Sequence, residues 1–500
     1  MIALLQTKAL PPLTQPTVIT VAVLYFAVVA VIGAWAARRT RTAADFFVAG
    51  QGIGLVALAV AAMAATLSGF AFIGGPGLLY TVGFGALFII LPAGLTNTMT
   101  AWVLAKKLRL LAEARGLITV PAAIGARYNS RLAQALSAVA MLIAIVGYMA
   151  TNMLALGLVI DAIFGIGLGP GIWLGMGITL AYSVAGGILA GVYTDVFQGS
   201  IMAVASLLVF LLALDVGGGM SEISRTIVAA DALFLAPWGK LTPLAALSFF
   251  FVFGLGALGQ PHVLHKFYML KDPQRLKWYP LLMTAALTLT LLLYFAIGVT
   301  VKALAVQGRI TLPSPDDATP AFLLGFTPIV VAALVFSGVA AAIMSTVNSF
   351  MNIGAAAITH DLPRAFGRPL ANELRVGRIA TIGLSLLAAL VAQFSGALVA
   401  FLGIFGWGLF ASTLVPALGI GLNWEAATRE GAIASIGTGL AVTLVFESLS
   451  YFRLFSFPAG ITISGLSLVL SLLVFFGVSW LTRSRAPRQL PEDVRLIMRA

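Results

Sequence analysis

The sequence predicts an all-α integral membrane protein, on the evidence of its composition, the length of its uncharged runs and the placement of its basic residues. Of the 500 residues, 60% are hydrophobic and only 9% are charged, and the mean hydropathy is +1.05. A soluble domain carries about a quarter charged residues, so this composition excludes a soluble globular protein. The chain has no cysteine, which excludes disulfides, thiolate metal sites and thiol catalysis.

The uncharged runs have room for about thirteen transmembrane helices. A bilayer core about 30 Å thick needs about 20 apolar helical residues. Most runs hold one crossing, and the runs 46–105 and 379–424 are each long enough for two. The expected helices cover residues 15–37, 52–74, 83–105, 132–158, 168–187, 196–214, 243–262, 279–301, 321–345, 379–395, 398–422, 431–450 and 459–482.

Basic residues give the orientation of these helices. If the first helix runs inward, 23 of the 29 Lys and Arg residues fall on one side, among them Lys266 and Lys271 after the seventh helix, whereas Lys8 falls on the other. Cytoplasmic loops carry the excess of basic residues, so the N-terminus is expected outside and the C-terminus in the cytoplasm. The net charge of +12 therefore reflects topology, and the expected location is the plasma (inner) membrane, as a multi-pass protein.

Gly and Pro clusters interrupt two of the expected helices, the second and the seventh. At membrane depth a break is tolerated only where the freed backbone groups line a cavity or meet protein. Each cluster opens a block of five helices, and paired breaks of this kind are typical of transporters with inverted repeats. Close helix packing through small residues is the alternative for a single cluster, but two clusters at corresponding positions favour breaks. The breaks are expected at Gly74, Gly75, Pro76, Gly254, Gly256, Gly259 and Pro261.

This pattern divides the chain into six parts. The two inverted repeats are residues 45–214, with helices two to six, and residues 243–422, with helices seven to eleven. The other parts are the extracellular N-terminus with a peripheral first helix (1–44), an extracellular loop (215–242), peripheral helices twelve and thirteen (423–482) and a basic cytoplasmic tail (483–500).

The ninth helix carries a polar strip that suits a small hard cation. Four of the five positions from Ser345 to Ser349 are polar in an otherwise apolar segment. An isolated hydroxyl in a membrane helix usually bonds back to a carbonyl one turn earlier, but Ser345 and Ser349 share a helical face with Thr346 beside them. Unwound carbonyls of the second helix, near Ala64 and Leu67, would complete a shell of neutral oxygens for Na+.

Asp195 lies between two apolar stretches, at the cytoplasmic end of the sixth helix. Two interpretations stay open for this carboxylate. It is either a helix N-terminal group that complements the helix dipole or an acidic group engaged in ion coupling, as carboxylates among membrane helices commonly are.

Three segments together resemble the sodium/solute symporter family, which contains the bacterial sodium/proline, pantothenate and sialic acid symporters. They are 186–198 (GGILAGVYTDVFQ), 259–262 (GQPH), and 341–346 (AAIMST) followed by 360–362 (HDL). The resemblance covers about residues 15–482. It implies a leucine-transporter-like core of five plus five inverted helices, here helices two to eleven, and import of a small organic solute with Na+ by alternating access.

The resemblance also implies particular ion-binding residues. The main sodium site would take the backbone oxygens of Ala64, Leu67 and Ala342 and the hydroxyls of Ser345 and Thr346. A second sodium ion would bind near Asp195, Ser345, Asn348 and Ser349, where Asn348 stands in place of the family's hydroxyl.

The substrate is expected to carry a carboxylate, as an amino acid or organic acid does. Thr66 and Ser68 resemble the pair that meets a substrate carboxylate in the sialic acid members, and broken helix ends also favour an anion. Trp407 is either a packing residue or a wall of the pocket, and packing is the favoured interpretation. The substrate-binding candidates are Thr66, Ser68, Phe70, Phe253 and Gln260.

The expected function is therefore sodium-coupled symport, with Na+ as the coupling ion and no organic cofactor. The expected partners are a small-molecule solute and the lipid bilayer, with no nucleic acid and no obligate protein partner, and no nucleophile and base are paired as in an enzyme. One alternative is a proton-coupled symporter of the same fold, for which Asp195 is the candidate carboxylate. Another is a membrane sensor that binds a solute without net transport, against which the short tail argues.

Overall fold

A computed structural model describes residues 16–49, 52–458 and 460–499, so the N-terminal segment with Lys8 lies outside the described residues. Within these ranges the regular structure is helical, apart from one isolated parallel bridge between Ile53 and Leu270.

The bounds of the helices are as follows. The α-helices are α1 (Pro16–Arg39), α2 (Ala43–Val48), α3 (Leu55–Thr66), α4 (Gly75–Val82), α5 (Leu87–Thr100), α6 (Lys106–Arg115), α7 (Val120–Tyr128), α8 (Arg131–Phe164), α9 (Leu168–Val216), α10 (Met220–Ala230), α11 (Pro243–Gly256), α12 (Pro261–Phe267), α13 (Tyr279–Val306), α14 (Ala318–Phe326), α15 (Ile329–Ala356), α16 (Leu362–Ala365), α17 (Glu373–Phe394), α18 (Val399–Leu414), α19 (Arg429–Tyr451), α20 (Ile463–Leu481), α21 (Ala486–Gln489) and α22 (Glu492–Met498). The π-helical segments are η2 (Phe70–Gly74), η4 (Ala101–Ala105), η9 (Ala357–Asp361) and η10 (Val415–Ile420). The 3-10 segments are η3 (Gly83–Ala86), η5 (Ala232–Leu235), η6 (Ala257–Gly259), η7 (Pro273–Trp278), η8 (Pro315–Asp317) and η11 (Arg483–Arg485).

Eleven helical segments of the described chain are long and apolar enough to cross a membrane. The thirteen expected helices all fall on helices of the structure, and the two counts differ for a simple reason. The segment Phe70–Arg115 holds the end of the second expected helix together with the third, and Leu168–Val216 holds the fifth and sixth. The all-α membrane fold expected from the sequence is thus confirmed.

The ninth expected helix begins later than the sequence pattern indicates. Its first residues form the separate helix α14, and Thr327 is extended, with φ −119° and ψ 152°. The cause is Pro328, because a proline disfavours helical backbone at the residue before it. The membrane helix itself is α15, which continues eleven residues beyond the expected end at 345.

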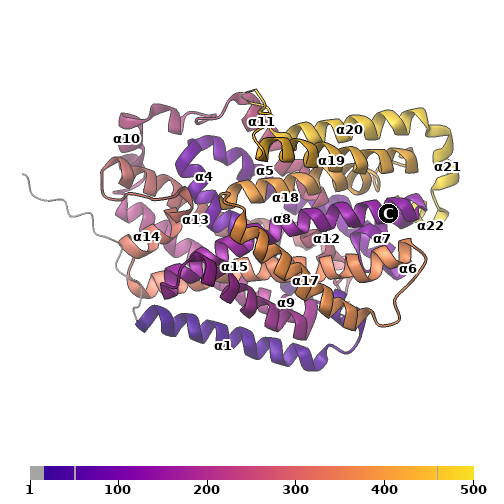
Figure 1. Cartoon of the computed structure of the whole chain (residues 1–500), viewed down its shortest axis with the longest axis horizontal. Coiled ribbons are helices and arrows are strands. Elements are labelled where there is room, and N and C mark those ends of the chain that lie inside the picture. Colours follow the sequence, from indigo (N-terminus) through magenta and orange to yellow (C-terminus); the bar gives the residue numbers. More distant parts are fainter. Residues whose placement is uncertain (1–15, 50–51, 459, 500) are drawn as a thin grey trace, which may run out of the picture.

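The helices divide into a buried centre and exposed flanks. In the most apolar stretch of α8, 83% of the residues are buried, and in that of α15 the share is 78%. The corresponding share is 28% in both α1 and α19. Figure 1 shows α1 along one flank and α19 with α20 along the opposite flank. The central helices α8 and α15 therefore position the polar groups of the interior.

The helix α9 consists of two antiparallel helices joined by a sharp turn at Gly187, which has φ 57° and ψ −147°. The Thr40 hydroxyl, at the end of α1, donates to Gly186 O at 3.0 Å. Twelve residues further along α9, Gln198 Nε2 donates to the hydroxyl of Tyr25, near the start of α1, at 2.8 Å. The chain after Gly187 therefore runs back along α1, as two expected crossings require.

The helix α3 ends at Thr66 because the backbone donors that would extend it bind elsewhere. Gly69 N donates to Asn152 Oδ1 at 2.8 Å, and Phe70 N donates to Ser68 Oγ at 3.2 Å. The chain resumes helical backbone in η2 and α4, so the second expected helix is broken near its middle.

The expectation that Gly74, Gly75 and Pro76 form this break is wrong. Gly74 and Gly75 have helical backbone, with φ −64° and ψ −36° and with φ −68° and ψ −51°. These glycines serve close packing instead, because a Cβ on Gly75 would overlap the Tyr294 ring and one on Gly74 would lie 2.8 Å from Ala400 N. A glycine cluster that breaks a helix and one that permits close helix packing look the same in the sequence.

The break in the seventh expected helix lies where the second half of its glycine cluster predicts. The helix α11 ends at Gly256, η6 follows, and Gln260 is extended, with φ −78° and ψ 104°. Pro261 then begins α12, and its ring disfavours a helical conformation at the residue before it. Gly254 lies inside α11 and is not part of the break, so that assignment is wrong, whereas Gly259 adjoins it.

We expect Gly187→Ala to destabilise the protein by about 1–3 kcal/mol, because this backbone conformation is accessible essentially to glycine alone. The added Cβ would also lie 2.7 Å from Phe46 O. The matched control is Gly177→Ala, because Gly177 lies in the same helix with open space around it. Thermal unfolding of the purified protein in detergent measures both, and equal unfolding midpoints would contradict the assigned turn.

We expect Asn152→Leu to destabilise the protein by about 1–3 kcal/mol, because the buried Gly69 N–H loses its acceptor. Thr151→Val is the control one residue away, since the buried Thr151 hydroxyl only bonds back to Gly147 O. The measurement is again the thermal midpoint. A loss in Asn152→Leu no larger than that in Thr151→Val would show that the broken helix does not depend on this acceptor.

Candidate functional site

Three carbonyl groups at the end of α3 are freed by the break. In a continuous helix, the carbonyl oxygens of Ala65, Thr66 and Leu67 would accept from the N–H groups four residues later. Those donors bind Asn152 and Ser68 instead. The freed oxygens thus lie in the interior of the bundle, beside α15.

A hydroxyl of α15 reaches this broken end directly. Thr346 Oγ1 donates to Ala65 O at 2.9 Å and to Ala342 O, one turn earlier in α15, at 3.1 Å. The side chain of Thr346 is fully buried. The end of α3 and the polar strip of α15 therefore form a single cluster of neutral oxygens.

The residues proposed for the main sodium site all belong to these two segments. In a continuous helix, Leu67 O would accept from Ala71 N. Here Ala71 N donates to Ser68 O instead, at 2.9 Å. Ser345 Oγ is buried without a hydrogen-bond partner among the described residues. Unwound carbonyls together with hydroxyls are the groups that hold Na+ in transporters with broken helices, so this donor set fits the ion. The five residues are Ala64, Leu67, Ala342, Ser345 and Thr346.

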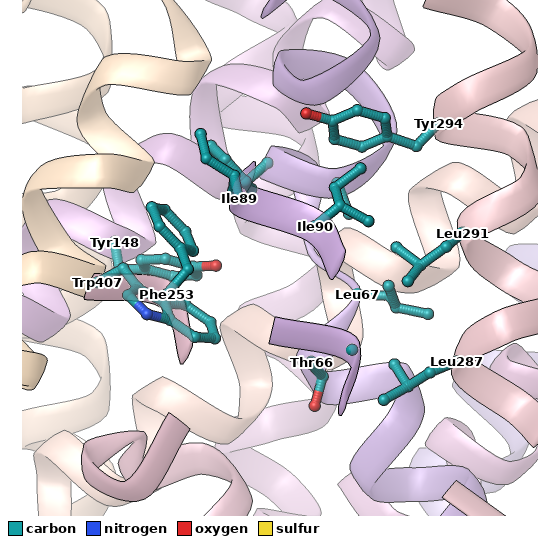
Figure 2. A pocket seen from close by; sticks show the side chains of 13 residues that line it. Thr66, Leu67, Ile89, Ile90, Tyr148, Phe253, Leu287, Leu291, Tyr294 and Trp407 are labelled. Atoms are coloured by element: carbon teal, nitrogen blue, oxygen red, sulfur yellow. The ribbon is translucent and has the colours of Figure 1, made fainter. Parts of the chain in front are cut away.

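A pocket lies next to the same break, as Figure 2 shows. Its wall is mostly apolar, and the lining residues with polar side-chain groups are Thr66, Tyr148, Tyr294 and Trp407. The lining residues are Thr66, Leu67, Phe70, Ala71, Ile89, Ile90, Gly94, Tyr148, Phe253, Leu287, Leu291, Tyr294 and Trp407.

Aromatic rings form one side of this pocket. The Phe253 ring stacks on Trp407 with the centroids 5.1 Å apart and on Phe70 at 5.7 Å. Trp407 Nε1 donates to Val252 O at 3.2 Å, which fixes the indole. Both interpretations of Trp407 therefore apply, because the same ring packs between helices and lines the pocket.

The structure separates the five substrate-binding candidates into two groups. Thr66, Phe70 and Phe253 line the pocket, whereas Ser68 and Gln260 do not. Ser68 Oγ lies 3.1 Å from the hydroxyl of Tyr148, a residue that does line it. Ser68 thus reaches the pocket through Tyr148.

The polar groups of two candidates are partly used within the protein. The Thr66 hydroxyl bonds back to Ala62 O at 2.7 Å. Gln260 Nε2 donates to Gly256 O at 3.2 Å, while its Oε1 has no partner within the described chain. Gln260 therefore holds the second helix break and keeps a free acceptor.

Asp195 forms a buried ion pair rather than a helix cap. Lys266 Nζ donates to Asp195 Oδ2 at 2.6 Å, and the side chains are 1% and 0% exposed. Lys266 comes from α12, just after the second helix break. The sequence counts Lys266 among the loop residues of the side proposed as cytoplasmic, whereas the structure buries its side chain. The one sequence signal for its burial is that it follows a helix break within a largely apolar segment.

Asn348 and Ser349 lie on the same face of α15 as Ser345. Asn348 Oδ1 accepts from Asn352 Nδ2 at 3.2 Å, and its Nδ2 packs against Gly191. Ser349 Oγ and Asp195 Oδ1 are buried and unpartnered in the part of the chain that the structure describes. Of the four residues proposed for a second sodium, Asp195 and Ser345 lie close together, and the Asp195 carboxylate already holds a lysine ammonium.

A loop between α13 and α15 closes against the broken helix and α18. Thr319 Oγ1, in α14, donates to Phe72 O at 2.6 Å, and Asp316 Oδ2 accepts from Val399 N at 2.9 Å. Burial raises the pKa of the Asp316 carboxyl to about 6. This loop therefore joins two helices that line the pocket.

Relatives of known function share most of the length of this chain. The high-affinity proline transporter of Bacillus subtilis is 28% identical, with 92% of this chain and 97% of the relative aligned. The sodium/pantothenate symporter of Escherichia coli is 27% identical, with 92% and 96% aligned. These proteins are transporters, and this chain is likewise a transporter rather than an enzyme.

The fold and a family model agree with these relatives. A solved structure of a Na+-coupled sialic acid symporter superposes with a TM-score of 0.75 and 19% identity, covering 95% of this chain and 98% of that one, which establishes the shared fold. The model of the sodium:solute symporter family matches residues 46–439. The resemblance noted in the sequence is thereby confirmed, and the chain belongs to the sodium:solute symporter family, whose coupling ion is Na+.

Proposed function

We propose that this protein is a sodium-coupled symporter that imports a small solute bearing a carboxylate, by alternating access. The observation that carries the proposal is the contact between the broken end of α3 and the hydroxyl face of α15, where Thr346 Oγ1 binds Ala65 O. Na+ bound at this junction would hold the two segments together. Ion binding and the shape of the pocket are coupled there because Thr66 and Leu67 belong to both the break and the pocket wall.

The carboxylate is inferred from the groups at the break. The hydroxyls of Ser68 and Tyr148 lie beside backbone N–H groups at the start of η2, and helix starts favour anions. Proline, pantothenate and sialic acid, which name the relatives and the structural neighbour, each carry a carboxylate. The remaining wall is aromatic and aliphatic, which suits the apolar part of an amino acid or organic acid.

Alternating access would use the two broken helices as a pair. One break opens the proposed repeat 45–214 and the other opens the proposed repeat 243–422. Transporters with such repeats bind substrate near the midplane and rock one bundle against the other. The sodium and solute sites at the first break are positioned for that motion.

The proposed orientation rests on the basic residues at the ends of the helices. Figure 1 shows α6, α7 and α22 at one end of the bundle and α10 and α14 at the opposite end. The first end carries the Lys and Arg residues of α6 and α7, so we place it in the cytoplasm. The location that follows is the plasma membrane, with the N-terminus outside.

The two alternatives differ from this proposal in what they require. Proton coupling needs a free carboxylate at the coupling site, whereas Asp195 is paired with Lys266. A sensor without transport would bind the solute but show no net flux. Uptake into proteoliposomes therefore separates all three.

We expect uptake to collapse when external Na+ is replaced by choline at fixed pH and membrane potential. Ser345→Ala should lower the apparent sodium affinity at least tenfold, because it removes an ion ligand. Ser337→Ala is the matched control, since this buried hydroxyl of the same helix only bonds back to Ala333 O. Sodium-independent uptake would refute the proposed coupling. Equal sodium affinity in the two variants would refute the ligand assignment.

We expect small carboxylates, and not their amides, to raise the thermal midpoint of the purified protein in the presence of Na+. The screen begins with proline, pantothenate and sialic acid. Ser68→Ala should weaken binding of the stabilising acid about tenfold, which corresponds to loss of one hydrogen bond to a charged group. Ser206→Ala removes a buried hydroxyl outside the pocket and is the control. Equal stabilisation by an acid and its amide would contradict the carboxylate assignment.

A further inference from the structure

We propose that the ammonium group of Lys266 is a built-in cation that takes the place of a second sodium ion at Asp195, so that each transport cycle carries one Na+. This inference rests on the proposed function, because it concerns how many ions accompany the solute. It replaces the second sodium site expected from the sequence.

The geometry places the ammonium where that second ion would bind. Lys266 Nζ lies 2.6 Å from Asp195 Oδ2. The hydroxyl of Ser345 also faces this carboxylate. Asp195 is thus already neutralised by a positive charge that belongs to the protein.

The remaining oxygens suit an ammonium as well as they suit a metal ion. An ammonium has three N–H donors, and Asp195 Oδ2 accepts one of them. Asp195 Oδ1, Ser345 Oγ and Ser349 Oγ are buried and lack partners among the residues described. Rotation of the ammonium and the hydroxyls would let the remaining donors reach these acceptors.

The amide of Asn348 is engaged with neighbouring groups of the protein. Its amide oxygen accepts from Asn352, and its NH2 group packs against Gly191. An NH2 group is a donor and does not coordinate a cation. A sodium ion here would therefore meet one carboxylate oxygen and two hydroxyls, opposed by the like charge of Lys266.

The three segments involved also explain why the cation would matter during transport. Lys266 lies in α12, after the second helix break, Asp195 lies in α9, and Ser345 in α15 belongs to the main sodium site as well. The lysine thus joins the second repeat to the first beside the coupling ion. A fixed charge performs this role without being carried across the membrane.

The test counts sodium ions bound to the purified protein, by equilibrium dialysis with radioactive Na+, and sodium ions moved per solute in proteoliposomes. We expect one in both measurements for the wild type. Lys266→Met should raise both numbers to two and the Hill coefficient for Na+ from about one toward two. Lys266→Arg keeps a positive charge and should retain one, as should Lys271→Met, which removes an exposed lysine of the same segment.

Two sodium ions per wild-type protein would overturn the proposal, and so would one ion in a folded Lys266→Met variant. If Lys266→Met does not fold, Lys266→Gln/Asn348→Ser offers a neutral amide and a hydroxyl in the same space, and it should bind two ions. The double variant Asp195→Asn/Lys266→Met removes both charges and should bind one. Failure of the proposed function is distinguishable, because no sodium would then bind to the wild type and uptake would not need it.

Discussion

The interior of this protein depends on a constraint that the bilayer imposes on the backbone. Away from water, every N–H and C=O group must find a partner within the protein, so a helix can break only where side chains replace its lost hydrogen bonds. At the end of α3 those side chains are Asn152, Ser68 and Thr346, which come from α8, the break itself and α15. The same arrangement leaves carbonyl oxygens free for an ion. The structural requirement and the ion site thus arise from one interruption.

A second feature of the interior is that the proposed sodium site between α3 and α15 uses no charged side chain. The proposed main sodium site consists of neutral oxygens, and the nearby carboxylate of Asp195 is neutralised by Lys266. Two unit charges 4 Å apart interact by about 4 kcal/mol at an effective dielectric constant of 20, so an additional sodium beside the ammonium would be strongly disfavoured. One Na+ entering down a potential of about 100 mV releases about 2.3 kcal/mol, which can support roughly fifty-fold accumulation of a neutral solute.

Much of the fold can be predicted from local sequence, and the errors have a common origin. The charge gaps identify all thirteen helices because a membrane helix is defined by its own length and polarity. The break at Gln260 is also local, since Pro261 disfavours helical backbone before it. The break at Leu67 and Ser68 has no such proline signal, and it depends on Asn152, which accepts from Gly69 N, 83 residues away. Conversely, Gly74 and Gly75 look like a break, but they make room for Ala400 and Tyr294.

The sequence by itself therefore determined the class of protein, the helices and the polar strip of α15, because each is a property of a contiguous segment. Only the tertiary structure decided which polar groups meet. Lys266 looks like a surface residue near a helix end, and its burial follows from a partner 71 residues away in another helix. Trp407 looks like a packing residue and becomes a pocket wall through Phe253. Contacts between distant segments depend on the packing of whole helices, which local composition does not encode.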